Sequence, residues 1–140
     1  PKTKRYVTLS PIPGFCQWLE KQQDRLDIDL YELRSTARVE GVDAAQVKQD
    51  EVLALCARYL VNERGPTNQA IDPVARFHLG NGASLHAIHW AADLSDNGLH
   101  QSAGLMVNYL YDLGSIEENH DAYFDQSEVA VSRLVAKHLS

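Results

Sequence analysis

The stretch DPVARFHLGNGA, residues 72–83, decides the fold of the chain around it. Asp72 is of a residue type that caps helix N-termini, and Pro73 suits the first helical turn. The segment Gly80–Gly82 ends such a helix, because glycine readily takes the left-handed conformation that follows a helix. The pattern therefore predicts a short helix from Pro73 to Leu79.

Two strands are expected after this helix. Residues 84–91 form the first, and residues 103–112 alternate as a second strand does. One face of the second strand carries Ala103, Leu105, Val107, Tyr109 and Tyr111. The Asn97-Gly98 pair between the two strands is typical of a hairpin turn. The sequence thus predicts an antiparallel hairpin near the C-terminus.

A third strand is expected before the helix, in the segment VTLSPIPGF, residues 7–15. Arg5–Leu9 alternates polar and apolar residues, and the prolines that follow remove backbone donors and end the strand. Residues 15–23 then place Phe15, Trp18 and Leu19 on one helical face.

A helical insertion is expected over about residues 16–70. Asp43 looks like the N-cap of a long helix from Ala44 to about Arg64, whereas residues 24–41 fit a second helix or a loop equally well. The run DQSE, residues 125–128, looks like a capping box for a final helix, and the acidic run before it reads as a solvated loop. This element order predicts an α+β fold.

Composition narrows the functional classes. The net charge of −6 argues against broad nucleic-acid binding, and no apolar run has the length of a membrane span. The basic residues Lys2, Lys4 and Arg5 read as a solvated chain end. The two cysteines, Cys16 and Cys56, fit a reducing, intracellular setting, and the last three residues are not a peroxisomal signal.

Ser10 and His78 are the side chains best placed for chemistry. Ser10 ends a strand before a rigid Pro-x-Pro-Gly turn, and the imidazole of His78 can exchange a proton near neutral pH. The structural alternatives are a serine that caps the turn or the next helix, and a histidine satisfied between helix and sheet. From the residues alone, both alternatives remain open.

No metal site is expected. His86 and His89 are three positions apart on a strand, so they point to opposite faces. Tyr109 and Tyr111 share one face of the predicted strand. They are either aromatic residues of the core or side chains whose phenol faces a cleft and donates a hydrogen bond to a ligand.

Four ordered blocks resemble the malonyl-CoA decarboxylase family. The segments VTLSPIPGF (7–15) and DPVARFHLGNGA (72–83) resemble the serine and histidine segments of that family, and HWAAD (89–93) and GLHQSAGLMVNYLY (98–111) also match its pattern. The resemblance implies a GNAT-like acyltransferase fold. Residues 1–140 would be the C-terminal part of one catalytic domain, and the loop that binds the coenzyme A pyrophosphate would lie upstream of Pro1.

The same resemblance implies decarboxylation of malonyl-CoA to acetyl-CoA and carbon dioxide. Ser10 and Tyr111 would orient the substrate carboxylate, and His78 would donate a proton to the α-carbon or activate a donor. No cofactor is implied, because the thioester accepts the electrons. The family also implies a homo-oligomer formed through regions outside this chain, in the cytoplasm or, in a eukaryote, the mitochondrion.

Two other functions remain as alternatives. One is an acyl-CoA-dependent acyltransferase on the same fold, which would need a site for an amine acceptor. The other is a noncatalytic half-domain that binds an acyl-CoA or a partner chain.

Overall fold

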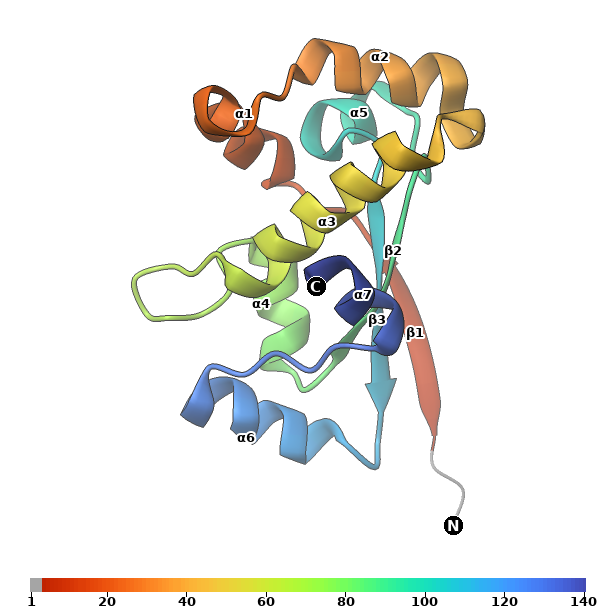
Figure 1. The fold of residues 1–140 in the computed structure, drawn as a ribbon. Helices are drawn as coiled ribbons and strands as arrows, with labels where there is room; N and C mark the ends of the chain where they lie inside the picture. Colours follow the sequence, from red (N-terminus) through yellow and green to blue (C-terminus); the bar gives the residue numbers. More distant parts are fainter. Residues whose placement is uncertain (1–3) are drawn as a thin grey trace.

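A three-stranded antiparallel sheet forms the spine of the molecule (Figure 1). The computed structural model describes residues 4–140, apart from the side chains of residues 23 and 24, so the basic residue Lys2 lies outside the described residues. The strands are β1 (Arg5–Ser10), β2 (Ser84–His89) and β3 (Met106–Asp112), in the spatial order β1-β3-β2.

The helices lie on one side of this sheet in Figure 1. They are α1 (Phe15–Leu26), α2 (Leu30–Glu40), the 3-10 helix η1 (Gly41–Asp43), α3 (Gln46–Asn62), α4 (Pro73–Gly80), α5 (Asp96–Ser102), α6 (Ile116–Gln126) and α7 (Arg133–Leu139). Helices packed on a small antiparallel sheet confirm the α+β prediction.

The alternation predicted for the last strand is confirmed from Met106 onward, but residues 103–105 are not in the strand, because Ala103 ends α5 in a left-handed conformation. In β3, Val107, Tyr109 and Tyr111 are buried. The strand register sets them opposite Ser10, Thr8 and Tyr6 of β1, respectively. Opposed residues in an antiparallel pair point to the same face. The face beneath the helices therefore carries six side chains in two adjacent columns.

The other face and one edge of the sheet are open. Val7 and Leu9 of β1 are 50% and 56% exposed. Within the described residues, β1 pairs only with β3, so its second edge has no neighbour. An unpaired edge beside an apolar face readily pairs with another strand.

The helix predicted from residue 73 is confirmed. The Asp72 carboxylate accepts hydrogen bonds from the backbone N–H groups of Val74 and Ala75, and Pro73 occupies the first turn. The helix ends at Gly80, one residue beyond the prediction, and leads into β2 through a tight turn.

Two predictions about the turns were wrong. Asp43 does not cap α3, because it lies in the 3-10 turn η1, and Ala45 precedes α3 without a side-chain cap. Asn97-Gly98 is not a hairpin turn. It lies in α5, because the Ser95 hydroxyl accepts the Gly98 N–H and starts a helix there. β2 and β3 are antiparallel neighbours as expected, but α5 lies between them in sequence.

The capping box predicted at residues 125–128 is also wrong. Gln126 ends α6, Ser127 takes a left-handed conformation, and Ser132 caps the final helix α7. The acidic residues Glu117 and Glu118 lie in the first turn of α6, where negative charge stabilises a helix. They therefore belong to a helix and not to a loop.

Gly82 is expected to be essential to the turn between α4 and β2. Its φ of +87° is strained for other residues, and a Cβ there would collide with the Ile116 carbonyl oxygen. We expect Gly82→Ala to lower the unfolding free energy of the full-length protein by about 2 kcal/mol or more in urea unfolding. Gly65→Ala is the control, because Gly65 has an ordinary φ and an added Cβ would meet the Gln69 carbonyl oxygen at an ordinary contact distance of 3.9 Å. Equal stability of the two variants would contradict this account.

Candidate functional site

The three side chains singled out in the sequence form one hydrogen-bonded line. Ser10 Oγ lies 3.2 Å from His78 Nε2, and His78 Nδ1 lies 2.5 Å from the Tyr111 hydroxyl. They come from β1, α4 and β3, so the site exists only once the sheet and α4 are assembled. The imidazole connects two hydroxyl groups that both face the helical side of the sheet.

The strand register explains why Ser10 lies close to His78 and Tyr109. Ser10 is the last residue of β1 and is buried, and its register partner Val107 is two residues from Tyr109. Ser10 Oγ also lies 3.3 Å from Thr8 Oγ1, so its hydroxyl pairs with side chains. In the described part of the chain it caps neither the turn nor α1, and the structural alternative for Ser10 is not observed.

Aromatic rings hold the imidazole in place. Tyr109 stacks on His78 with ring centroids 4.4 Å apart and planes 19° apart, and Phe77 meets the ring edge-on. Tyr6 stacks on Tyr111 at 4.9 Å. The Tyr109 hydroxyl is buried and has no hydrogen-bond partner among the described residues. These contacts restrict how far His78 and Tyr111 can turn.

Burial sets the protonation states of the line. It lowers the pKa of His78, so the imidazole is neutral at pH 7. It raises the pKa of Tyr111, so the phenol is protonated. A protonated Tyr111 that donates to Nδ1 leaves Nε2–H to donate to Ser10, whose own proton is then free for a ligand. The other tautomer reverses this direction.

An open cavity of about 450 Å³ reaches the line. Its lining residues are Tyr6, Thr8, Phe77, His78, Asn81, Tyr111 and Ile116. His78 and Tyr111 lie at this wall, whereas Ser10 is not a lining residue and is linked to the cavity through its hydrogen bond to His78. A phenol and an imidazole at such a wall can orient an anion and transfer a proton.

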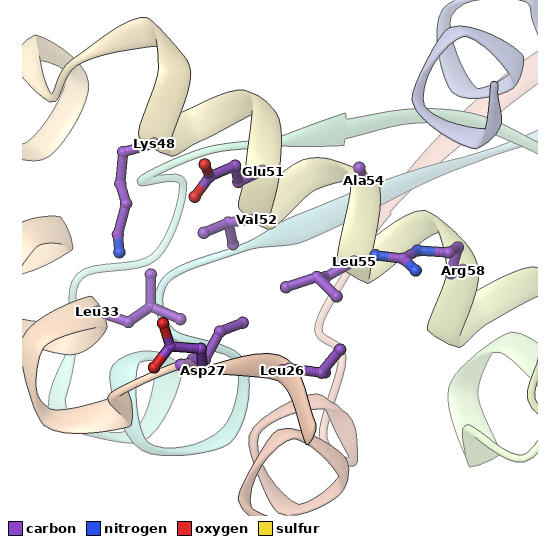
Figure 2. A pocket seen from close by; sticks show the side chains of 10 residues that line it. Leu26, Asp27, Leu33, Lys48, Glu51, Val52, Ala54, Leu55 and Arg58 are labelled. Atoms are coloured by element: carbon purple, nitrogen blue, oxygen red, sulfur yellow. The ribbon is translucent and has the colours of Figure 1, made fainter. Parts of the chain in front are cut away.

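A second cavity of about 450 Å³ lies in the helical part of the chain, as Figure 2 shows. Leu33, Val52 and Leu55 form its apolar wall, and Lys48 and Arg58 carry charge at its rim. No histidine, cysteine, serine or tyrosine lines it. Its ionisable lining groups are Asp27, Glu51, Lys48 and Arg58, whereas the histidine and tyrosine singled out in the sequence line the cavity at His78.

Neither a metal cluster nor a membrane span is found in residues 4–140. No three histidine, cysteine or acidic side chains gather there in a way that could hold an ion. Every helix in this range is too short or too polar to cross a lipid bilayer.

Comparison with known proteins decides the family. The family model "Malonyl-CoA decarboxylase C-terminal domain" matches residues 1–140. The chain belongs to the malonyl-CoA decarboxylase family. Mitochondrial malonyl-CoA decarboxylases of Anser anser anser and Rattus norvegicus are 31% and 34% identical to it, over 100% and 96% of this chain. The cytoplasmic location expected above remains a prediction.

Solved members of the malonyl-CoA decarboxylase family share the fold. The enzyme of Rhodopseudomonas palustris superposes with a TM-score of 0.85 at 43% identity and covers 96% of this chain. That of Agrobacterium vitis gives 0.83 at 40% identity over 98%. The matched region is 33% and 36% of those two chains, and 33% of the goose and rat proteins. The chain thus spans about a third of its relatives' length.

The sequence did not reveal the roles of two residues at or near the site, Tyr6 and Asp72. Tyr6 was seen only as a strand residue, although the register stacks it on Tyr111. Asp72 was seen only as a helix cap, although it also binds the backbone of Gly14. Alternation could have placed Tyr6 on the face of Ser10. No pattern in the sequence joins Asp72 to Gly14.

The lowered pKa of His78 gives a pH prediction. Because the folded pKa lies below the unfolded value of about 6.5, protonation favours the unfolded chain. The contribution of His78 to stability is therefore lost as pH falls below about 6.5. NMR titration of the full-length protein should give His78 a midpoint below that of the urea-unfolded protein. A midpoint above it would contradict the burial argument.

Proposed function

We propose that the full-length protein containing this chain decarboxylates malonyl-CoA to acetyl-CoA and carbon dioxide. The hydrogen-bonded line of Ser10, His78 and Tyr111 at an open cavity carries this proposal. Membership of the malonyl-CoA decarboxylase family supports the choice of substrate.

The reaction breaks the bond between the carboxyl carbon and the α-carbon. The electron pair moves into the thioester, which becomes an enolate, and carbon dioxide leaves. The α-carbon then takes up one proton and acetyl-CoA forms. The thioester itself accepts the electrons, so the proposed reaction needs no cofactor. The protein must hold the carboxylate out of the enolate plane, stabilise the oxyanion and supply the proton.

The three side chains suit these tasks. The hydroxyls of Ser10 and Tyr111 can orient the carboxylate, each in the tautomer of His78 that leaves its own proton free. His78, which lies between them, gives its Nε2 proton to the α-carbon or to the Ser10 hydroxyl that donates it, while its Nδ1 takes the Tyr111 proton, which water then replaces. The stacked ring of Tyr109 keeps the imidazole in this position.

We also propose that residues 1–140 are the C-terminal part of a GNAT-like catalytic domain. Among the described residues the outer edge of β1 has no neighbour and its Val7 and Leu9 side chains are exposed, so another strand could pair with this edge, which supports the proposal. The part of the family's polypeptide outside this chain would supply that strand and the pyrophosphate loop. In this proposal the helical insertion runs over about residues 16–70.

The experiment is a product analysis with malonyl-CoA labelled at the free carboxyl carbon. The full-length protein should release the label as carbon dioxide in equal amounts with acetyl-CoA, and without any amine. Transfer of an intact malonyl group to an added amine would instead support the acyltransferase alternative. Binding of malonyl-CoA without turnover would support the noncatalytic one.

Ser10→Ala is expected to lower turnover by about 10²–10³-fold, the usual effect of losing one donor to a developing anion. Folding should change little, because the turn at residues 11–14 is retained. Ser102→Ala is the control. Ser102 is a buried serine whose hydroxyl donates only to backbone carbonyls, so its loss should reduce stability and leave the turnover of folded protein unchanged. Full activity in folded Ser10→Ala would remove Ser10 from the mechanism.

A further inference from the structure

Asp72 is the one buried carboxylate in the part of the chain that the structure describes, with 0% exposure. Its oxygens accept four hydrogen bonds. Oδ2 accepts from the backbone N–H groups of Val74 and Ala75, at 3.2 and 3.1 Å. Oδ1 accepts from the Gly14 N–H at 3.2 Å and from the Tyr59 hydroxyl at 3.1 Å. One carboxylate thus binds the segment after β1, α3 and the start of α4.

Helix capping does not account for this burial. Asp29, Ser95 and Ser132 cap other helices of this chain from exposed or half-buried positions. Burial raises the pKa of Asp72, and a carboxylate withdrawn from water is unfavourable unless hydrogen-bond donors compensate. The groups that donate hydrogen bonds to Asp72 belong to three separate segments of the chain. The carboxylate therefore holds these segments together in addition to capping α4.

The connection joins the two halves of the site. Gly14 lies four positions after Ser10, in the same proline-rich turn, and Asp72 starts the helix that carries His78. The Gly14 position fits only glycine, because a Cβ there would collide with the Tyr59 hydroxyl. Burial raises the pKa of Tyr59, so its phenol stays protonated and donates to Asp72.

We propose that Asp72 is a positioning residue that sets the separation between Ser10 Oγ and His78 Nε2. Its carboxylate fixes the segment after Ser10 against the N-terminus of α4, and α4 in turn fixes His78. Its effect on catalysis rests on the function proposed above, whereas its effect on the Ser10–His78 hydrogen bond does not. An error of about 1 Å in such a site costs on the order of 100-fold in rate.

The variant Asp72→Asn separates the capping of α4 from the hydrogen bond that joins Asp72 to Gly14. Asparagine caps helices as well as aspartate does, so its oxygen can keep the bonds from Val74 and Ala75. Its amide nitrogen then faces the Gly14 N–H, and two donors cannot bond. We expect the full-length variant to remain folded, with KM for malonyl-CoA near the wild-type value and kcat lower by about 10- to 100-fold.

The deciding readout is the ¹⁵N chemical shift of the His78 ring. In Asp72→Asn the Nε2 signal should move toward its position in Ser10→Ala, where the Ser10 bond is absent. Tyr59→Phe removes only the hydroxyl donor and should move the signal less, in the same direction. Ser132→Ala is the control for a lost helix cap, and it should lower stability without moving the signal.

A wild-type His78 signal in folded Asp72→Asn would overturn the proposal, whatever happens to turnover. Should Asp72→Asn not fold, a wild-type signal in Tyr59→Phe would overturn it equally. Failure of the proposed function looks different. A His78 variant would then keep full turnover, while the Nε2 signal of His78 in Asp72→Asn would still move toward its position in Ser10→Ala.

Discussion

His78→Ala in the full-length protein is expected to lose malonyl-CoA turnover by about 10²–10⁴-fold, the usual contribution of general acid–base catalysis. The imidazole lies between the Ser10 and Tyr111 hydroxyls, so its loss interrupts the only hydrogen-bonded line at the cavity wall in the described residues. Coenzyme A affinity should stay near the wild-type value, since no step proposed for His78 involves the nucleotide. Initial rates and titration calorimetry measure the two effects separately.

His100→Ala is the matched control for this prediction. His100 is exposed in α5, away from the cavity, and its backbone carbonyl rather than its ring accepts the bond from Arg34. This variant should keep wild-type turnover. Near-wild-type turnover in His78→Ala would remove His78 from the mechanism.

Residues 1–140 expressed alone are expected to show no detectable turnover and weak coenzyme A binding. The chain spans about a third of its relatives' length, and β1 presents a free edge beside the exposed side chains Tyr6, Val7 and Leu9. Such an edge favours aggregation. Size-exclusion chromatography and release of labelled carbon dioxide measure both expectations.

Leu9→Lys serves as the control for aggregation. A charge on this 56% exposed face should make the fragment more soluble without restoring turnover. If the fragment were a soluble monomer with the turnover of the full-length protein, the proposed domain boundary would be wrong.

The sequence predicted best where one local rule decides the structure. The alternation of residues 106–111 identified the buried face of β3, because a strand has a period of two, although the strand begins three residues later than the predicted Ala103. Asp72-Pro73 marked the start of α4 for a similar reason, since capping depends on adjacent residues.

Prediction failed where two local patterns compete or where tertiary contacts decide. Residues 93–98 contain turn formers that also start helices, and here Ser95 starts α5. In α6 the apolar pattern is weak. Its buried Tyr123 accepts the Ala70 N–H through its hydroxyl, a contact that no local pattern shows.

The candidate site was visible only in pieces. Ser10 and His78 are 68 positions apart, and each had an ordinary structural alternative when read alone. The family resemblance joined them with Tyr111 before any geometry was known. The link from Asp72 to Gly14 spans 58 positions and involves a backbone N–H, which leaves no trace in residue type.

The most direct measurement is a crystal structure of the full-length protein with a malonyl-CoA analogue in which an N–H replaces the thioester sulfur, because the resulting amide accepts electrons poorly and keeps its carboxylate. We expect the analogue's carboxylate to lie about 2.6–3.2 Å from Ser10 Oγ or from the Tyr111 hydroxyl, which bond to opposite ring nitrogens of His78. A carboxylate bound away from both hydroxyls, for example in the cavity beside Leu33 and Leu55, would contradict the proposed mechanism.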